Sequence, residues 1–416
     1  MRADPLTFLE EQVERYGELV ALPVPGPPVL LVTDPVAVRQ VLQAGARHWT
    51  KDTVQYRTLA RVTGPGLLAN PGPGWIERRR IVAPAFHHRR LDGVVSAVRD
   101  GARGAWGGLP RSGGVVDVEA LALRSTLEVV GHTLFACDLG PDTEALVAAT
   151  DAVAELIVAR AAAPVPWPGR GVVRRRLGHA SASLDRICRG VIAARRERGP
   201  GDDDDLLGLL LAAGLADDDV RDELVTMVVA GHETVAAALT WTLWLLARHP
   251  EAQARLREEV RSAQPSSPWQ GWHDLPWTRA VIDEALRLYP PAWVLSRRAS
   301  RADLLAGQPV PEGTLAIISP WVVHRRATSW PDPERFDPGR FLGVGTAARA
   351  DYLPFGLGPR LCIGRDFALV ELTVLLAELL RGHRVSVSAG SGPLERDVFV
   401  TVRPRGGLRL HVAPVP

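Results

Sequence analysis

Apolar residues recur at every third or fourth position over most of this chain, and this spacing predicts α-helices with one buried face. The first such stretch is 6–19, in which Leu6, Leu9 and Val13 share a face. Most of the chain is therefore expected to be helical. Further helices are predicted at about 34–43, in two segments within 115–160, at 218–249, 250–263 and 277–288, and from 366 to about 381.

Short apolar runs without helical spacing predict a smaller amount of β-structure. Val29–Val32 reads as a buried strand, and further strands are expected around Pro309, at 314–318 and in the tail beyond 381. Residues 50–74 are rich in glycine and proline and predict a long irregular loop, which is often functional. The expected fold class is mainly α with small β-sheets.

The helix predicted at 218–249 is unusually long, on the order of 45 Å at 1.5 Å per residue. Its apolar run from Leu224 to Leu246 is long enough to span a bilayer, but His232, Glu233 and Thr234 lie at the middle of that run. Ionisable groups at that depth are costly in lipid. The run is therefore predicted to be a buried helix that crosses a soluble protein.

Composition narrows the class of protein further. The chain has 416 residues, and no linker or composition shift divides it, so a single domain covering 1–416 is expected. A net charge of +2 gives no strong attraction to nucleic acid. Three cysteines provide no disulfide framework, and the start of the chain shows neither a signal peptide nor a membrane anchor. These features predict a cytoplasmic protein, and we expect a monomer.

The stretch with the most specific chemistry is Phe355–Gly364, which reads FGLGPRLCIG. Cys362 lies two residues after Arg360 and just before a predicted helix. A nearby cation and a helix N-terminus both favour the thiolate, which is a metal ligand. Gly356 and Gly364 allow the backbone to fold tightly around the sulfur. Cys362 is therefore predicted to bind a metal.

This stretch resembles the haem-binding loop of the cytochrome P-450 family, F-x-x-G-x-R-x-C-x-G, at Phe355, Gly358, Arg360, Cys362 and Gly364. The resemblance implies the fold of that family, a haem b cofactor and Cys362 as its axial iron ligand. It also implies that one oxygen atom from O2 is inserted into a small molecule, by hydroxylation or epoxidation. No flavin or iron–sulfur motif is apparent, so a separate ferredoxin and its reductase are expected to supply the electrons.

A second match lies in the long helix, where residues 230–234 read AGHET and resemble the family motif A-G-x-[D/E]-T. The resemblance places Ala230 and Gly231 close to the haem and gives Glu233 and Thr234 the catalytic role of passing protons to bound dioxygen. A threonine hydroxyl can disturb helix hydrogen bonding and hold a water, and a carboxyl can act as a general acid. His232 occupies the variable position and is not assigned as a ligand.

Other motifs of the family concern the haem propionates and the structure. Trp75 and Arg79 match W-x-x-x-R and are expected to reach a propionate, together with Arg360 and, on weaker grounds, Arg298 and His324. Glu and Arg three residues apart on a helix can pair. The resemblance implies a buried triad that supports the haem loop. Its expected members are Glu284, Arg287 and Arg335, from the E-x-x-R and P-E-R-F segments.

The expected substrate is hydrophobic, with a terpenoid or fatty-acid-like molecule favoured, because the segments that the family places around its substrate are apolar here. A basic region around 78–90 fits an acidic redox partner or a merely solvated face equally well. The candidate substrate contacts are Val229, Ala292, Trp293, Val294, Leu295 and Phe399.

Two other functions stay open at this point. One is a haem-thiolate peroxygenase or isomerase that does not use O2; fatty-acid peroxygenases of the fold replace the acid–threonine pair by Arg-Pro, so Glu233 and Thr234 argue against it. The other is a non-enzymatic haem-binding or sensor protein, which would leave that pair without a purpose.

Overall fold

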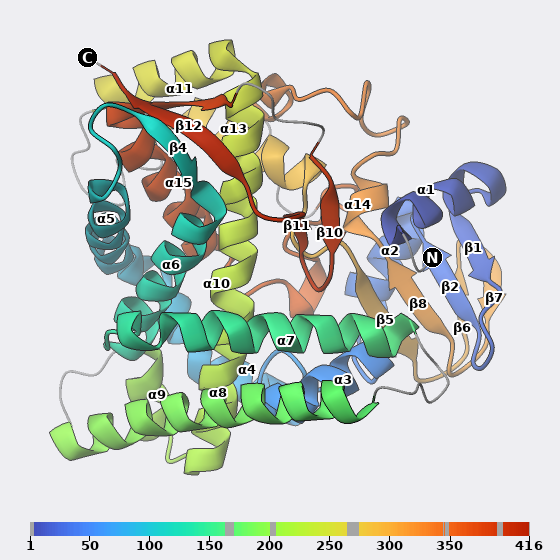
Figure 1. Cartoon of the computed structure of the whole chain (residues 1–416). Coiled ribbons are helices and arrows are strands. Elements are labelled where there is room, and N and C mark those ends of the chain that lie inside the picture. Colours follow the sequence, from blue (N-terminus) through green and yellow to red (C-terminus); the bar gives the residue numbers. More distant parts are fainter. Residues whose placement is uncertain are drawn as a thin grey trace.

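The long central helix α10 (Asp217–Arg248) organises the molecule and runs through its whole height (Figure 1). The computed structural model describes residues 4–162, 170–199, 205–263, 274–343, 345, 349–388 and 394–415. Its other principal helices are α1 (Pro5–Tyr16), α2 (Pro35–Arg39), α3 (Val54–Thr63), α4 (Gly74–Val82), α5 (Leu91–Gly107), α6 (Val118–Val130), α7 (Thr143–Ala162), α8 (Arg170–Arg198), α9 (Leu206–Ala212), α11 (Pro250–Ser262), α13 (Pro276–Leu288), α14 (Pro320–Val323) and α15 (Arg365–Gly382).

The sequence of α10 explains both its length and its place in the core. Three aspartates, Asp217–Asp219, occupy its first turn, where negative charge stabilises the positive end of the helix dipole. The helix ends at Arg248, just before Pro250, which opens α11. Its most apolar stretch is 83% buried inside the molecule. Among the described residues, α10 is the one helix long and apolar enough to span a bilayer, and this burial confirms that it is a core helix.

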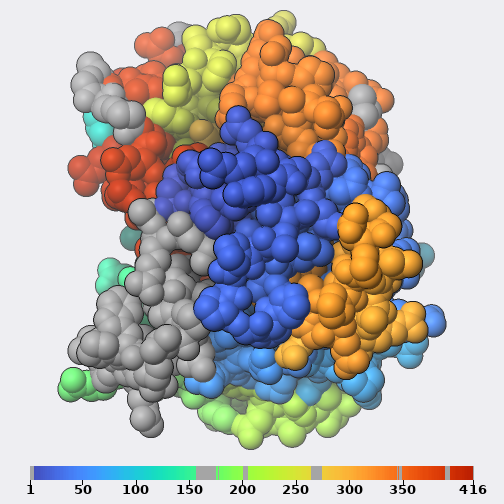
Figure 2. Space-filling view, turned by 90° about the vertical axis from the view of Figure 1, so that its right-hand side faces the viewer, coloured from blue at the N-terminus to red at the C-terminus, as the bar shows by residue number. Residues whose placement is uncertain are grey.

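The β-structure forms small sheets at the periphery. The largest has the strand order β1-β2-β8-β5-β3 and lies beside α1 (Figure 1). The space-filling view shows the N-terminal residues, in blue, covering this side next to the orange residues of the β6–β7 hairpin (Figure 2). The strands are β1 (Leu19–Leu22), β2 (Val29–Val32), β3 (Trp49–Thr50), β4 (Gly114–Asp117), β5 (Leu295–Ala299), β6 (Asp303–Leu305), β7 (Gln308–Val310), β8 (Leu315–Ile318), β9 (His383–Val387), β10 (Arg396–Val398), β11 (Val402–Pro404) and β12 (Arg409–Pro414).

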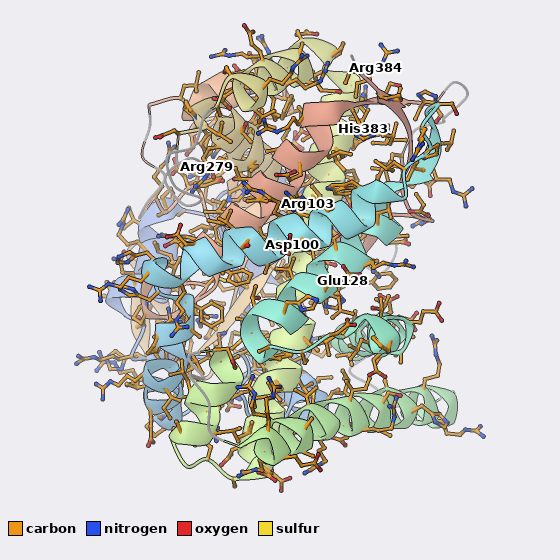
Figure 3. All side chains as sticks on the ribbon, turned by 90° about the vertical axis from the view of Figure 1, so that its left-hand side faces the viewer. Asp100, Arg103, Glu128, Arg279, His383 and Arg384 are labelled. Atoms are coloured by element: carbon orange, nitrogen blue, oxygen red, sulfur yellow. The ribbon has the colours of Figure 1, made fainter. Side chains whose placement is uncertain are left out.

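Helix α5 shows how the outer helices attach to the core. Its apolar face, which includes Val95 and Val98, is buried, whereas Asp100 and Arg103 point outward and pair at 3.4 Å (Figure 3). Arg99 on the same helix pairs with Glu378 of α15 at 3.1 Å. Because α15 directly follows the cysteine loop, α5 supports that loop from outside.

The region 50–74 departs from the predicted irregular loop. Helix α3 occupies Val54–Thr63, a stretch without glycine or proline in which Leu59 and Val62 are buried. The glycines and prolines that suggested a loop begin only at Gly64, where φ is +69° and the helix ends. Trp167, which lies in a proline-rich part of the sequence and could face substrate or serve in packing, lies outside the described residues.

Candidate active site

A cavity of about 1540 Å³ lies between α10 on one side and the cysteine loop with α15 on the other. A pocket for one drug-sized molecule has about 300–1,000 Å³, so this cavity has room for a large cofactor and a substrate together. Its walls include the loop residues Phe355, Gly356, Cys362 and Gly364, and the α10 residues Ala230, Gly231, Glu233 and Thr234. Two motifs about 130 residues apart in the sequence therefore face one space.

Cys362 lies deep in the molecule, and its side chain is exposed to the cavity. Its backbone N–H donates to the Phe355 carbonyl at 2.9 Å, which closes the loop. Burial raises the pKa of the thiol, and the amide N–H of Gly364, which donates to the sulfur, and the positive charge of Arg79 oppose that rise. This is the environment expected of a thiolate ligand that is stabilised by amide hydrogen bonds.

Gly358 allows the cysteine loop to pass against the π-helical turn Gln40–Ala44, which follows α2. Its φ is +73°, and a Cβ built there would lie 2.1 Å from the Leu42 carbonyl oxygen. Gly356 has a similar φ of +75°, but its nearest neighbour, a methyl group of Leu295, would lie 4.0 Å away. The two glycines therefore share the same conformational demand and differ in the space around them.

We expect Gly356→Ala to lower the free energy of unfolding by about 1–2 kcal/mol, because a side chain is strained at positive φ. Gly358→Ala carries the same strain plus the collision with the Leu42 carbonyl, so it should lose a further 1–3 kcal/mol or so. Urea unfolding of both variants measures the difference. Equal losses would contradict the close contact at Gly358.

Among the cations that line the cavity, Lys51, Arg79, Arg297 and Arg360 have no carboxylate partner in the described part of the chain. Each donates instead to a backbone carbonyl at 2.8–3.0 Å, those of Leu68, Leu361, Ser296 and Asn70 respectively.

Arg79 and Arg360, which were predicted from the sequence to reach a propionate, both lie close to the Trp75 ring. Arg360 lies 3.8 Å and Arg79 lies 5.4 Å from the Trp75 ring centroid. Burial lowers the pKa of Arg360 to about 10 and pushes that of Lys51 well below its ordinary value, with the neighbouring arginines adding to both effects. Buried cations that lack a partner are costly, so this wall fits a ligand with carboxylates of its own.

The site also fits a metal ion that takes most of its ligands from a cofactor and not from the protein. Within the described residues, no group of three or more His, Cys, Asp or Glu side chains could hold a metal ion. An iron bound to Cys362 would therefore take its remaining ligands from a cofactor. Haem meets both requirements, since its ring nitrogens bind the iron and its propionates match the cationic wall.

Lys51 was not identified from the sequence, although a signal was present: it is the only lysine in a chain that is rich in arginine. We expect Lys51→Met to weaken haem binding about 10- to 100-fold, the size of one charge-assisted hydrogen bond. Lys51→Arg keeps the charge and serves as the control.

The same side chain offers a direct test by chemical labelling. Apart from the α-amino group, Lys51 is the only site that an amine-reactive reagent can modify. Bound haem should therefore protect Lys51 from labelling. Equal labelling of the haem-free and haem-loaded protein, measured by mass spectrometry, would contradict this placement.

Arg298 and His324, predicted as propionate ligands, do not line the cavity. Side chains alternate along a strand, so Arg297 of β5 faces the cavity whereas Arg298 lies beside the turn at Gly313. His324 is fully buried: the Leu353 amide donates to its Nε2 at 2.6 Å, and its Nδ1 contacts the Arg287 carbonyl at 3.1 Å. Burial lowers the pKa of His324 to about 3, so it is a neutral structural residue next to the start of the cysteine loop.

On the α10 side, Glu233 and Thr234 both line the cavity. The Thr234 hydroxyl donates to the Ala230 carbonyl at 2.8 Å, and burial raises the pKa of Glu233. A Cβ at Gly231 would lie 3.2 Å from a Val130 methyl group, so this glycine also lets α6 approach α10 closely. His232 is buried with its Nδ1 2.6 Å from the Val228 carbonyl, consistent with its having no ligand role.

The expected triad is present with a different third member. Glu284 and Arg287 are fully buried and form two hydrogen bonds of 2.7 and 2.9 Å. Arg335 is exposed and contributes only its carbonyl, to which Arg287 donates at 3.2 Å. The second arginine is Arg340, whose Nε lies 3.5 Å from Glu284 Oε1. The 3₁₀ turn at Pro338–Phe341 places Arg340, rather than Arg335, next to that carboxylate.

The candidate substrate contacts surround the same cavity. Trp293 is fixed by a hydrogen bond of 2.8 Å from its indole N–H to the Phe399 carbonyl, which ties the segment before β5 to the C-terminal tail. Met227 of α10 and Leu134, just after α6, also line the cavity and were not predicted. All six predicted contacts lie in the wall: Val229, Ala292, Trp293, Val294, Leu295 and Phe399.

The chain is similar to known proteins over nearly its whole length. The sequence model of the family described as cytochrome P450 matches residues 2–410. The chain is 34% identical to cyclooctat-9-en-7-ol 5-monooxygenase of Streptomyces melanosporofaciens, over 93% of this chain and 86% of that protein. It is 33% identical to pentalenene oxygenase of Streptomyces avermitilis, over 93% and 88%. The crystal structure of CYP175A1 from Thermus thermophilus superimposes with a TM-score of 0.82 at 34% identity, covering 99% of this chain and 95% of that one.

Proposed function

Because this chain belongs to the cytochrome P-450 family of haem-containing monooxygenases, we propose that it inserts one oxygen atom from O2 into a terpenoid at this cavity, with Cys362 as the axial ligand of haem b. The observation that carries the proposal is the arrangement of the cavity. One wall holds a thiol and unpaired cations, and the facing helix holds an acid next to a hydroxyl. Haem ligated by a thiolate supplies the activation of dioxygen.

The residues of the chain bind the cofactor and handle protons. Arg79, Arg360 and Lys51, together with Arg297, offer the propionates cations that no carboxylate of the described residues occupies, and Trp75 fixes two of these side chains. Across the cavity, the Thr234 hydroxyl is the group that can present a proton to a bound oxygen. Glu233 is the acid beside it that can supply that proton. The apolar walls exclude water from both.

A terpenoid substrate is supported by the lining and by the relatives. Pentalenene oxygenase and cyclooctat-9-en-7-ol 5-monooxygenase are named for the oxygenation of terpenoids. In this chain the segment from Ala292 to Leu295 and the side chains of Val229 and Phe399 give the cavity an apolar surface suited to such a molecule. A fatty acid would bring a carboxylate into this apolar region, so a polycyclic hydrocarbon or alcohol fits better.

The electrons are proposed to come from a separate ferredoxin and its reductase. His88 and Arg89, which precede α5, are exposed, and Arg80 is exposed on α4. This basic surface suits an acidic donor protein. We further propose that residues 1–416 act as a single domain, which the match of one family model to residues 2–410 supports, and that the protein is a cytoplasmic monomer.

Turnover with isotopically labelled dioxygen tests the function. The purified haem-loaded protein, with a ferredoxin, its reductase and NADPH, is expected to place one labelled oxygen atom in a terpenoid hydrocarbon or alcohol. A matched assay with fatty acids decides between the two substrate classes. Product formed with hydrogen peroxide alone, and none with ferredoxin, would contradict the use of O2.

A further inference from the structure

The carboxylate of Glu233 is held by the C-terminal part of the chain, far away in sequence. Glu233 is 2% exposed on α10. The Thr401 hydroxyl, just before β11, donates to its Oε1 at 2.5 Å, and the Nε of Arg403 on β11 lies 3.8 Å from the same oxygen. The β10–β11 hairpin therefore supplies both a hydrogen bond and a positive charge to the acid in the cavity.

Arg403 is shared with a second carboxylate that reaches the surface. Its other arm lies 2.9 Å from Oδ1 of Asp151 on α7, the helix that crosses in front of α10 (Figure 1). The exposed fractions of the side chains fall from 40% for Asp151 to 14% for Arg403 and 3% for Glu233. The three groups thus form a line of alternating charge from solvent to the cavity.

A third carboxyl group completes this cluster. Glu119, on α6, is 8% exposed, and burial raises its pKa to about 7, an effect that Arg403 opposes and that Asp117 at the end of β4, Asp151 and Glu233 strengthen. One guanidinium therefore faces three carboxyl groups, and it cannot fully neutralise all of them. Another ionisable neighbour is His232, whose pKa is lowered by burial.

We propose that Arg403 is a positioning residue for Glu233, and that Asp151 competes for Arg403, so that these two side chains set whether the Glu233 carboxyl carries a proton. The proposal rests on the proposed role of Glu233 only for its consequence in catalysis. The placement of the proton is a property of the folded protein and is measured without turnover.

The two partners should act in opposite directions. An opposite charge close to a carboxyl group favours its ionised form, whereas a like charge favours its protonated form. Arg403→Gln should therefore raise the pH at which Glu233 ionises, and Asp151→Asn should lower it because Arg403 then serves Glu233 alone. A cluster with a merely structural role would not give shifts of opposite sign.

The measurement is the infrared carbonyl stretch of protonated Glu233, followed over pH in the haem-loaded full-length protein. The band is assigned by its loss in Glu233→Gln. All variants carry Glu119→Gln as background, because Glu119 is a second buried carboxyl group of this cluster whose pKa burial raises. The expected change is a tenfold or larger increase in proton affinity in Arg403→Gln and a decrease in Asp151→Asn, by roughly the size known for a neighbouring charge.

Arg403→Lys keeps the charge and should restore most of the parent midpoint. If Arg403→Gln fails to fold, Asp151→Asn and Arg403→Lys still decide the question. An unchanged midpoint in Asp151→Asn, or shifts of the same sign in both neutral variants, would overturn the proposal. The yield of product per electron supplied is measured in parallel. Infrared shifts without any change in that yield would leave the proposal standing and would refute the proton-transfer role of Glu233 instead.

Discussion

Arg287→Leu is expected to lower the free energy of unfolding by about 3–5 kcal/mol, the cost of leaving a buried partner charge uncompensated. Arg287 uses all of its donor capacity: two hydrogen bonds go to Glu284 and three go to the carbonyls of His324, Pro333 and Arg335. Its loss would strip a fully buried carboxylate of its main partner and release three segments at once. Denaturant unfolding of the haem-loaded protein measures the loss.

Arg335→Ala is the matched control for that variant. The Arg335 side chain is exposed, and only its carbonyl accepts from Arg287, so the substitution should change stability by less than about 0.5 kcal/mol. Arg340→Ala is expected to fall between the two, because its guanidinium lies 3.5 Å from Glu284. Equal losses for Arg335→Ala and Arg287→Leu would restore the triad predicted from the sequence and contradict the arrangement found in the structure.

Thr234→Ala is expected to retain haem but to divert electrons from product to hydrogen peroxide. The hydroxyl faces the cavity beside Glu233 and bonds within its own helix, to Ala230. Its removal should therefore change little in the fold. General acid–base groups contribute about 100- to 10,000-fold, so the product formed per electron should fall at least tenfold or so. One assay measures the product formed, the NADPH consumed and the hydrogen peroxide released in the same reaction.

Thr240 provides a control for this experiment on the same helix. Its hydroxyl makes the same kind of bond, 2.7 Å to the Ala236 carbonyl, but it is fully buried and does not line the cavity. Thr240→Ala should therefore keep the parent yield even if it lowers stability. A Thr234→Ala protein that couples electrons to product as well as the parent does would refute the proton role of Thr234.

Long periodic segments and contiguous motifs could be predicted from the sequence. Helix α10 is recognisable by its length and its apolar face, and the cysteine loop by fixed residues within ten positions. In both, the residues that identify the element are close together in the sequence. Helix α3 was missed because the glycines and prolines that follow it dominated the composition of the whole stretch.

Where long-range packing decides which of two nearby residues faces the site, the local sequence pattern could not identify that residue. Arg297 and Arg298 are adjacent, and only the pairing of β5 with β8 decides which of them faces the cavity. Arg335 and Arg340 are likewise alternatives until the turn between them is known. The link from Glu233 to Arg403 joins residues 170 positions apart, and no local signal indicates it.

The absorption spectrum of the reduced protein with carbon monoxide shows whether Cys362 binds the haem iron as a thiolate. We expect a strongly red-shifted Soret band in the parent protein and its loss in Cys362→Ser. A parent band at the shorter wavelength typical of histidine or protonated-thiol ligation, or a protein that takes up no haem, would contradict this expectation.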